Sequence, residues 1–167
     1  KSKKEYFQSS RNHEYFILDA ENSTSILFFY VDNGIDINNI TLRNGNYEVL
    51  LGYNTWSMGG AVCLRSSPKF TNIVFDNNYI GLTLALDSNP IILRSTICNN
   101  EMGIYTIEMG ENNLSIINSI LWGNENNIFQ SITSSFSNIE GDTTWTGAGN
   151  INVDPLFTDP ENNDYTL

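Results

Sequence analysis

One seven-residue segment recurs four times along the chain, as NITLRNG from Asn39, NIVFDNN from Asn72, RSTICNN from Arg94 and NSILWGN from Asn118. The copies start 33, 22 and 24 residues apart, and the long first interval holds an extra loop at about residues 46–59. SNIEG from Ser137 is a degenerate fifth copy. Self-similarity at this spacing is typical of proteins built from stacked repeats, so the repeat governs the interpretation of the fold.

The aligned copies separate into apolar and polar columns. Because side chains alternate between the two faces of a strand, residues two apart share a face. Three columns are predicted to point inward: Ile37, Phe70, Ile92 and Ile116; Ile40, Ile73, Ser95 and Ser119; and Leu42, Phe75, Ile97 and Leu121. An outward column lies between the last two: Thr41, Val74, Thr96 and Ile120. A second strand upstream adds two inward columns: Phe29, Val62, Leu84 and Ile107, and Val31, Leu64, Leu86 and Met109.

Helical periodicity is almost absent, and the abundant Asn, Ser, Thr, Gly and Ile favour strands and turns. A repeat of ~22 residues cannot bury its apolar face alone, whereas stacked repeats share a continuous core. A hairpin meander is the competing architecture, but it requires reversed strand partners, and the copies here align in one direction. We therefore predict an all-β solenoid in which about five to six coils stack in parallel. We expect residues 1–167 to form one segment, in which residues 1–15 are irregular or form a cap, residues 16–141 form the coils, and residues 142–167 form a closing loop region.

The composition limits the partners of the chain. Its 167 residues are enough for one domain. The net charge is −11, with 8 basic residues, which argues against nucleic acid because phosphate binding needs clustered cations. The longest apolar run, Ile26–Val31, is far shorter than the ~18 residues of a membrane span, so we expect no transmembrane segment.

Two stretches resemble a known family. GGAV at residues 59–62, followed by SSPKFTNIVFDNN at residues 66–78, resembles repeats of right-handed parallel β-helix proteins, both in the pectin-lyase-like superfamily and in polymorphic outer-membrane proteins. The later NSILWGN, SNIEG and GNINVDPLFTDPENNDYTL resemble the last coils of secreted bacterial surface proteins of that superfamily. The resemblance implies a right-handed parallel β-helix, an extracellular or cell-surface location, and a segment of a longer protein.

Asparagine marks the same turn in three copies, at Asn39, Asn72 and Asn118, and Arg94 takes its place in the remaining one. Asn tolerates the left-handed backbone conformation that such turns use. Stacked Asn amides also hydrogen-bond to one another and to the turn backbone. We interpret these residues as a structural ladder, and a role in ligand binding is the alternative.

Two predicted outward columns carry charge. The first holds Asp32, Arg65 and Asp87, and coils ~4.8 Å apart would bring opposite charges together. We favour surface ion pairing for this column. The resemblance to pectate lyases implies an alternative in which Arg65 is a catalytic base beside acidic calcium ligands.

The second charged column holds Arg43, Asp76, Cys98 and Trp122. An exposed Trp beside charged groups can hold a sugar, because the ring stacks on it while the charges bind hydroxyls or carboxylates. We favour the interpretation that Trp122 packs under a loop, and carbohydrate contact is the alternative. If the chain binds an extracellular glycan, the candidate contact residues of the two columns are Arg43, Asp76, Trp122, Arg65 and Asp87.

Few residues are suited to catalysis. Cys63 and Cys98 fall on different columns, and a disulfide needs Cα atoms within ~7 Å, so we expect free thiols. The only histidine, His13, lies near a terminus, which argues against Ser-His-Asp and Cys-His sites. We expect no cofactor, with calcium as the alternative.

The acidic tail carries the oxygen ligands that calcium prefers, but no Asp-x-Asp-x-Asp-Gly loop holds them together. These ligands are Asp154, Asp159, Asp164, Asn150, Asn152, Asn162 and Asn163. We therefore predict that Pro155, Leu156 and Phe157 fold back on the last coil while the polar residues stay solvated, and calcium binding is the alternative.

Three classes of function remain. We predict a non-catalytic structural or adhesive segment; a carbohydrate-binding module and a polysaccharide lyase-like enzyme acting on acidic glycans are the alternatives. The pectin-type hydrolases that share the resemblance carry Asp-Asp, Gly-His-Gly and Arg-Ile-Lys motifs, and this sequence has none of them. Solenoid ends expose unpaired strands, which Lys1 to Lys4, Pro155 and Pro160 would shield only in part. We therefore expect flanking coils or end-to-end self-association, which could build filaments.

Overall fold

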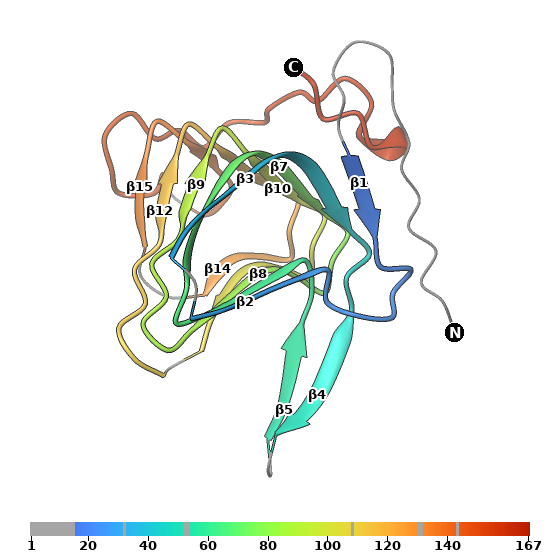
Figure 1. Cartoon of the computed structure of the whole chain (residues 1–167). Coiled ribbons are helices and arrows are strands. Elements are labelled where there is room, and N and C mark those ends of the chain that lie inside the picture. The colour runs from blue at the N-terminus through green and yellow to red at the C-terminus, as the bar shows by residue number, and fades with distance from the viewer. Residues whose placement is uncertain (1–15, 32, 52–53, 108, 130–131, 143) are drawn as a thin grey trace.

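The chain is all-β, as predicted. The computed structural model describes residues 16–31, 33–51, 54–107, 109–129, 132–142 and 144–167. These residues contain sixteen strands and one short 3-10 helix, η1 (Pro160–Asn162). The strands form two parallel sheets and one antiparallel hairpin (Figure 1). The parallel pairing excludes the hairpin meander. Among the described residues, no helix is long and apolar enough to cross a membrane.

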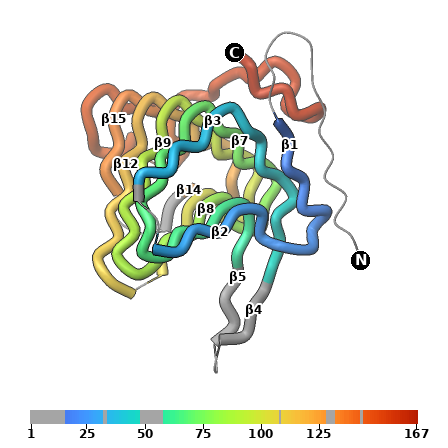
Figure 2. Tube along the Cα trace, viewed as in Figure 1, coloured from blue at the N-terminus to red at the C-terminus, as the bar shows by residue number. Residues whose placement is uncertain are grey.

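The two parallel sheets lie opposite each other, and the larger one is strongly curled (Figure 1). This sheet A contains β1 (Phe16–Asp19), β3 (Asn33–Arg43), β7 (Ser67–Asp76), β9 (Ile91–Leu93), β10 (Thr96–Cys98), β12 (Ser115–Ile117), β13 (Ile120–Trp122), β15 (Thr133–Ser135) and β16 (Asn138–Ile139). Sheet B contains β2 (Leu27–Tyr30), β6 (Ala61–Leu64), β8 (Ile80–Ala85), β11 (Met102–Thr106) and β14 (Asn126–Phe129). Figure 2 shows successive repeats of the trace lying one behind another.

The region predicted as an extra loop is a β-hairpin. Strands β4 (Tyr47–Leu51) and β5 (Asn54–Met58) pair antiparallel and project from the body of the molecule (Figure 1). The hairpin is inserted between β3 and β6, so it interrupts the repeat without changing the pairing of the parallel strands.

The register of sheet A confirms the predicted columns. Ile37, Phe70, Ile92 and Ile116 are successive partners across β3, β7, β9 and β12. Leu42, Phe75, Ile97 and Leu121 are successive partners across β3, β7, β10 and β13, and so are Thr41, Val74, Thr96 and Ile120. Leu42, Phe75, Ile97 and Leu121 are fully buried, whereas the threonine-containing column is half-buried on the outer face.

In sheet B, the two predicted columns align β6 one residue out of register with its neighbours β2 and β8. Phe29 pairs with Cys63 rather than Val62, and Cys63 pairs with Leu84. For Phe29 the cause lies in β3, where the register shifts between Asn33 and Asp36 and one extra residue offsets β2 from β6. A second offset separates Val62 from Leu84, because partners of β6 and β8 are 21 residues apart whereas partners of β7 and β9 are 22 apart. A one-residue slip reverses which face each side chain occupies. In the second column, Leu64 likewise pairs with Tyr30 and Ala85 instead of Val31 and Leu86.

The core lies between the two sheets. Phe70 sits at its centre, with its ring 5.8 Å from that of Phe29 and 5.5 Å from that of Phe75, both edge to face. Aliphatic side chains from both sheets surround these rings: Leu42, Ile73, Leu82, Leu84, Ile92, Ile97, Ile104, Leu114, Ile116, Leu121 and Ile139. The stacked repeats therefore share one apolar interior.

A buried asparagine ladder lies beside this core, where the chain leaves sheet A. Asn78 N–H donates to Asn100 Oδ1 at 2.8 Å, and Asn100 N–H donates to Asn124 Oδ1 at 3.0 Å. Each side-chain amide also donates to a backbone carbonyl of the preceding repeat, Asn78 to Leu42, Asn100 to Phe75 and Asn124 to Ile97. The ladder thus satisfies backbone groups that the strand pairing leaves open, as burial requires.

The C-terminal residues do two things. Trp145 packs against the core, and Ile151 forms a parallel bridge with Asn138, so this part covers the last repeat. The chain then runs back along sheet A toward β1 (Figures 1 and 2). The prediction that residues 155–157 fold back on the last coil is therefore wrong in detail: Leu156 is 76% exposed, and Phe157 contacts Tyr165, 5.3 Å between ring centroids.

Candidate functional site

The strand register brings the predicted column of Arg43, Asp76, Cys98 and Trp122 together on the outer face of sheet A. Arg43 pairs with Asp76, Asp76 with Cys98, and Cys98 with Trp122. Each residue follows an inward-pointing member of the core column, and alternation along the strand turns it outward. The four residues do not share one environment, however, because the returning C-terminal segment covers the middle of the column.

Asp76 is the buried centre of this face, with only 2% of its surface exposed. The Tyr165 hydroxyl donates to Asp76 Oδ1 at 2.6 Å. Asn99 Nδ2 donates to the Tyr165 hydroxyl at 2.8 Å and, more weakly, to Asp76 Oδ1 at 3.4 Å. Burial raises the pKa of Asp76, and the hydrogen bonds from Tyr165 and Asn99 and the charge of Arg43 only partly oppose this rise.

Arg43 is held by the neighbouring repeat rather than by Asp76. Its Nε donates to Asp19 Oδ2 at 2.8 Å, and Asn44 Nδ2 donates to Asp19 Oδ1 at 2.9 Å. Partial burial raises the pKa of Asp19, but hydrogen bonds from Asn44, the Glu21 N–H and Arg43 outweigh it, so the pKa is lowered overall. Asp19 is therefore ionised over the physiological range and fixes the direction of the Arg43 stem.

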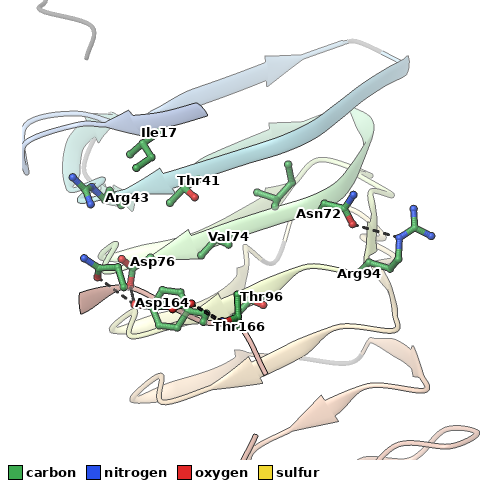
Figure 3. A pocket seen from close by; sticks show the side chains of 13 residues that line it. Ile17, Thr41, Arg43, Asn72, Val74, Asp76, Arg94, Thr96, Asp164 and Thr166 are labelled. Carbon is green, nitrogen blue, oxygen red and sulfur yellow. Dashed lines mark hydrogen bonds between the residues drawn. The ribbon is translucent and has the colours of Figure 1, made fainter. Parts of the chain in front are cut away.

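A groove of about 650 Å³ opens beside this cluster (Figure 3). Its floor is the outer face of sheet A, and the C-terminal segment forms one wall. Arg43 and Arg94 lie at its two ends in Figure 3. The remaining lining residues are Ile17, Thr41, Asn72, Ile73, Val74, Asp76, Thr96, Asn163, Asp164, Tyr165 and Thr166.

The predicted asparagine ladder lies along one edge of the groove. Asn72 Nδ2 donates to Asn39 Oδ1 at 3.1 Å, and Arg94 Nε donates to Asn72 Oδ1 at 3.4 Å. Asn39, Asn72, Arg94 and Asn118 all have a left-handed backbone, with φ between 48° and 57°. These left-handed residues bend sheet A at the same point in successive repeats. Arg94 takes the place of an amide donor in this stack.

The other candidate residues lie apart from the groove. Arg65 and Asp87 are exposed in the turns that follow β6 and β8, and both have a left-handed backbone. Asp87 Oδ1 accepts the Glu111 N–H at 2.7 Å. Arg65 and Asp87 form no ion pair with each other in the part of the chain that the structure describes, where the ion pair found joins Arg43 to Asp19. Asp32, the third member of that column, and His13 lie outside the described residues.

Trp122 is half-buried beside Cys98 and does not line the groove among its described residues. Both cysteines are buried free thiols, as predicted. Burial raises the pKa of both thiols, and the nearby charge of Asp76 adds to the effect at Cys98. Neither thiol therefore has the thiolate character of a reactive cysteine.

The acidic tail residues are engaged within the tail. Asp159 Oδ2 accepts Asn162 Nδ2 at 2.8 Å, and Asp164 Oδ1 accepts the Thr166 hydroxyl at 2.7 Å. The Thr166 hydroxyl and the Thr166 N–H, which both donate to Asp164 Oδ1, lower the pKa of Asp164. Across the described ranges, no group of three or more His, Cys, Asp or Glu side chains is placed to hold a metal ion.

Sequence reasoning missed the wall of the groove, because Tyr165 and Asp76 are 89 residues apart and belong to no common repeat. The only local signal is an aromatic residue within a polar tail, and that signal does not identify its partner. A comparison with known proteins gives no further guide: no family model, no curated protein and no solved structure matches the chain.

Proposed function

We propose that this chain is a non-catalytic structural or adhesive segment of a secreted or cell-surface protein, built as a right-handed parallel β-helix of about five to six coils. The observation that carries the proposal is the use of polar side chains to link one repeat to the next. The outer Asn39–Asn72–Arg94 stack, the buried asparagine ladder and the Arg43–Asp19 pair all join neighbouring repeats. Such links resist movement of one repeat against the next, so they make the stack of repeats rigid.

Two features support the finer architecture. In sheet A, successive partners such as Val74, Thr96 and Ile120 are 22 and 24 residues apart, which fits one coil per repeat. The GGAV and SSPKFTNIVFDNN stretches resemble pectin-lyase-like repeats, and that resemblance supports both the right-handed path and the extracellular location.

End-to-end association is part of the proposal. Exposed large apolar residues gather at both ends of the stack, with Phe28, Tyr30 and Val31 on the first repeat and Phe136, Ile151 and Val153 on the last. The charge is also uneven: residues 95–167 hold ten acidic residues and no Lys or Arg, a net charge of −10, whereas residues 1–94 hold 8 basic and nine acidic residues, a net charge of −1. Contact between the nearly neutral first end and the acidic last end brings together fewer like charges than contact between two last ends, which favours head-to-tail contacts.

We expect the weight-average mass of the chain to increase with concentration in sedimentation or light scattering. Phe28→Asp, at the exposed edge of sheet B, should shift this increase to at least tenfold higher concentration, because about 1.4 kcal/mol corresponds to a factor of ten. Ile91→Asp is the matched control, since Ile91 is exposed to a similar degree in the middle of the stack. A chain that stays monomeric at high concentration and low salt would contradict end-to-end association.

Glycan binding is the second candidate, and the groove is the observation that favours it. Residues 16–167 contain four basic residues, and two of them, Arg43 and Arg94, line the groove together with hydroxyl-bearing Thr41 and Thr96. Hydroxyl and guanidinium groups beside apolar Val74 suit a sugar ring with a polar rim.

Incubation with a uronic-acid polymer, with and without calcium, separates these candidates. We expect no unsaturated product and no new reducing ends, because Arg43 and Arg94 are held in side-chain links between repeats. Retarded migration in a gel that contains the polymer, lost in Arg94→Gln, would favour the binding module. Turnover that is abolished by Arg65→Gln or Arg94→Gln would establish a lyase-like enzyme and contradict the non-catalytic proposal.

A further inference from the structure

The C-terminal residues 157–166, here called the strap, form a small element with its own internal bonds. Asp159 and Asp164 exchange backbone hydrogen bonds of 3.1 and 2.9 Å, and the Thr158 N–H donates to the Thr166 carbonyl at 2.9 Å. The rings of Phe157 and Tyr165 pack edge to face. The strap can therefore keep its shape when it leaves the sheet, because these bonds do not involve the rest of the chain.

The strap is attached to sheet A at one point. In the part of the chain that the structure describes, the hydrogen bonds that join the strap to the sheet all run through the Tyr165 hydroxyl, to Asp76 and Asn99. Most of the strap is exposed, and Phe157 is only half-buried. An element with one polar anchor and little buried apolar surface opens more easily than the core of a domain.

The strap covers two groups that the strand alternation turns outward. Asp76 and Cys98 are neighbours on the outer face of sheet A, yet they are only 2% and 1% exposed. The Tyr165 hydroxyl lies against both of them. It donates a hydrogen bond to Asp76, and it lies close enough to the Cys98 thiol to oppose part of the rise in the pKa of that thiol. The other thiol, Cys63, faces inward and belongs to the core between the sheets.

We propose that the strap is a reversible cover, anchored by Tyr165, which opens while the β-sheets stay folded and uncovers Asp76 on the floor of the groove and Cys98 beside it. Opening removes the wall formed by residues 163–166, so the same motion changes the size of the groove and admits larger ligands.

The charges around Asp76 give the motion a pH dependence. Asp76 faces Arg43 of β3, Cys98 of β10, and Tyr165 with the neighbouring Asp164 of the strap. Burial raises the pKa of Asp76 in the closed state, so closing favours the protonated acid. Burial and the bond to Asp76 also raise the pKa of Tyr165, so closing favours the neutral phenol. Both effects stabilise the closed strap at low pH and weaken it as the pH rises through the raised pKa of each group.

The two thiols report the opening directly. The native protein is treated with a thiol-alkylating reagent, and labelling at each cysteine is followed by peptide mass spectrometry. Each rate is divided by the rate in the same chain unfolded at the same pH, which removes the intrinsic pH dependence of the thiols. Cys98 should react through strap opening, and Cys63 only through unfolding of the core.

We expect Tyr165→Phe to raise the relative labelling rate of Cys98 about tenfold, since the anchor hydrogen bonds of the hydroxyl are lost, and to leave Cys63 unchanged. Tyr30→Phe, which removes a hydroxyl from an exposed residue of β2 in sheet B, is the matched control and should change neither rate. Asp76→Asn should slow Cys98 labelling at neutral pH and flatten its pH dependence. Circular dichroism checks that each variant is folded. Equal rates at Cys98 and Cys63 in the wild type and in Tyr165→Phe would overturn the proposal.

Discussion

Phe75→Ala is expected to lower the free energy of unfolding by ~3–5 kcal/mol, because it leaves a cavity that the surrounding structure cannot close. Phe75 is fully buried, and its ring contacts that of Phe70. Its neighbours above and below in the column, Leu42 and Ile97, are held by parallel strand pairing on both sides. Backbone strands fixed by hydrogen bonds cannot move together to fill the space.

The measurement is urea unfolding, in which the midpoint and the slope are determined separately. Phe136→Ala is the control: it makes the same chemical change at a phenylalanine that is 63% exposed. We expect the control to change stability by less than ~0.5 kcal/mol, as surface substitutions usually do. A loss below ~1 kcal/mol for Phe75→Ala would contradict the tightly packed interior between the sheets.

The sequence was sufficient to predict sheet A, because each copy keeps the same number of strand residues before and after its turn residue, although the intervals between copies vary. Ile37, Phe70 and Ile92 could be aligned by counting from Asn39, Asn72 and Arg94, and the observed register agrees. The charged column of Arg43, Asp76, Cys98 and Trp122 followed from the same count. Local periodicity carries this information, so a single sequence was enough.

Sheet B was predicted out of register for a physical reason. The bulge between Asn33 and Asp36 adds one residue without adding a visible turn signal, so counting from sheet A assigns Phe29 the wrong partner. The hairpin β4–β5 was expected only as an extra loop. Both features arise where the chain departs from its own period.

The candidate site was predicted only in part. Arg43 and Asp76 were identified as outward neighbours, but the burial of Asp76 depends on Tyr165 and Asn99. No periodic pattern links the tail to β7, because the contact is made once and is not repeated along the stack. Contacts of that kind require the folded chain.

The buried asparagine ladder leads to the second large effect. Asn100 is almost fully buried, and its side-chain amide donates to the Phe75 carbonyl at 3.0 Å, the Cys98 carbonyl at 2.8 Å and Asn124 Oδ1 at 2.8 Å. Its Oδ1 accepts the Asn78 N–H at 2.8 Å. One side chain thus satisfies three backbone groups inside the stack. Asn100→Ala would remove all of these hydrogen bonds, although the Cys98 carbonyl would keep a backbone partner, the Asn77 N–H at 3.3 Å.

We expect Asn100→Ala to lower the free energy of unfolding by ~3–5 kcal/mol, because each unsatisfied buried group costs ~1–3 kcal/mol and water entering the cavity would recover part of that loss. Urea unfolding measures the change, with Asn126→Ala as control, since Asn126 is an exposed residue of β14 in the next repeat. Asn100→Asp tests the role of the amide more sharply: it keeps the acceptor for the Asn78 N–H but loses both donors, so it should be destabilising at neutral pH and less so when the acid is protonated. If both Asn100 variants unfold at the wild-type midpoint, hydrogen bonding by the ladder is not what holds the repeats in register, and apolar packing alone must do so.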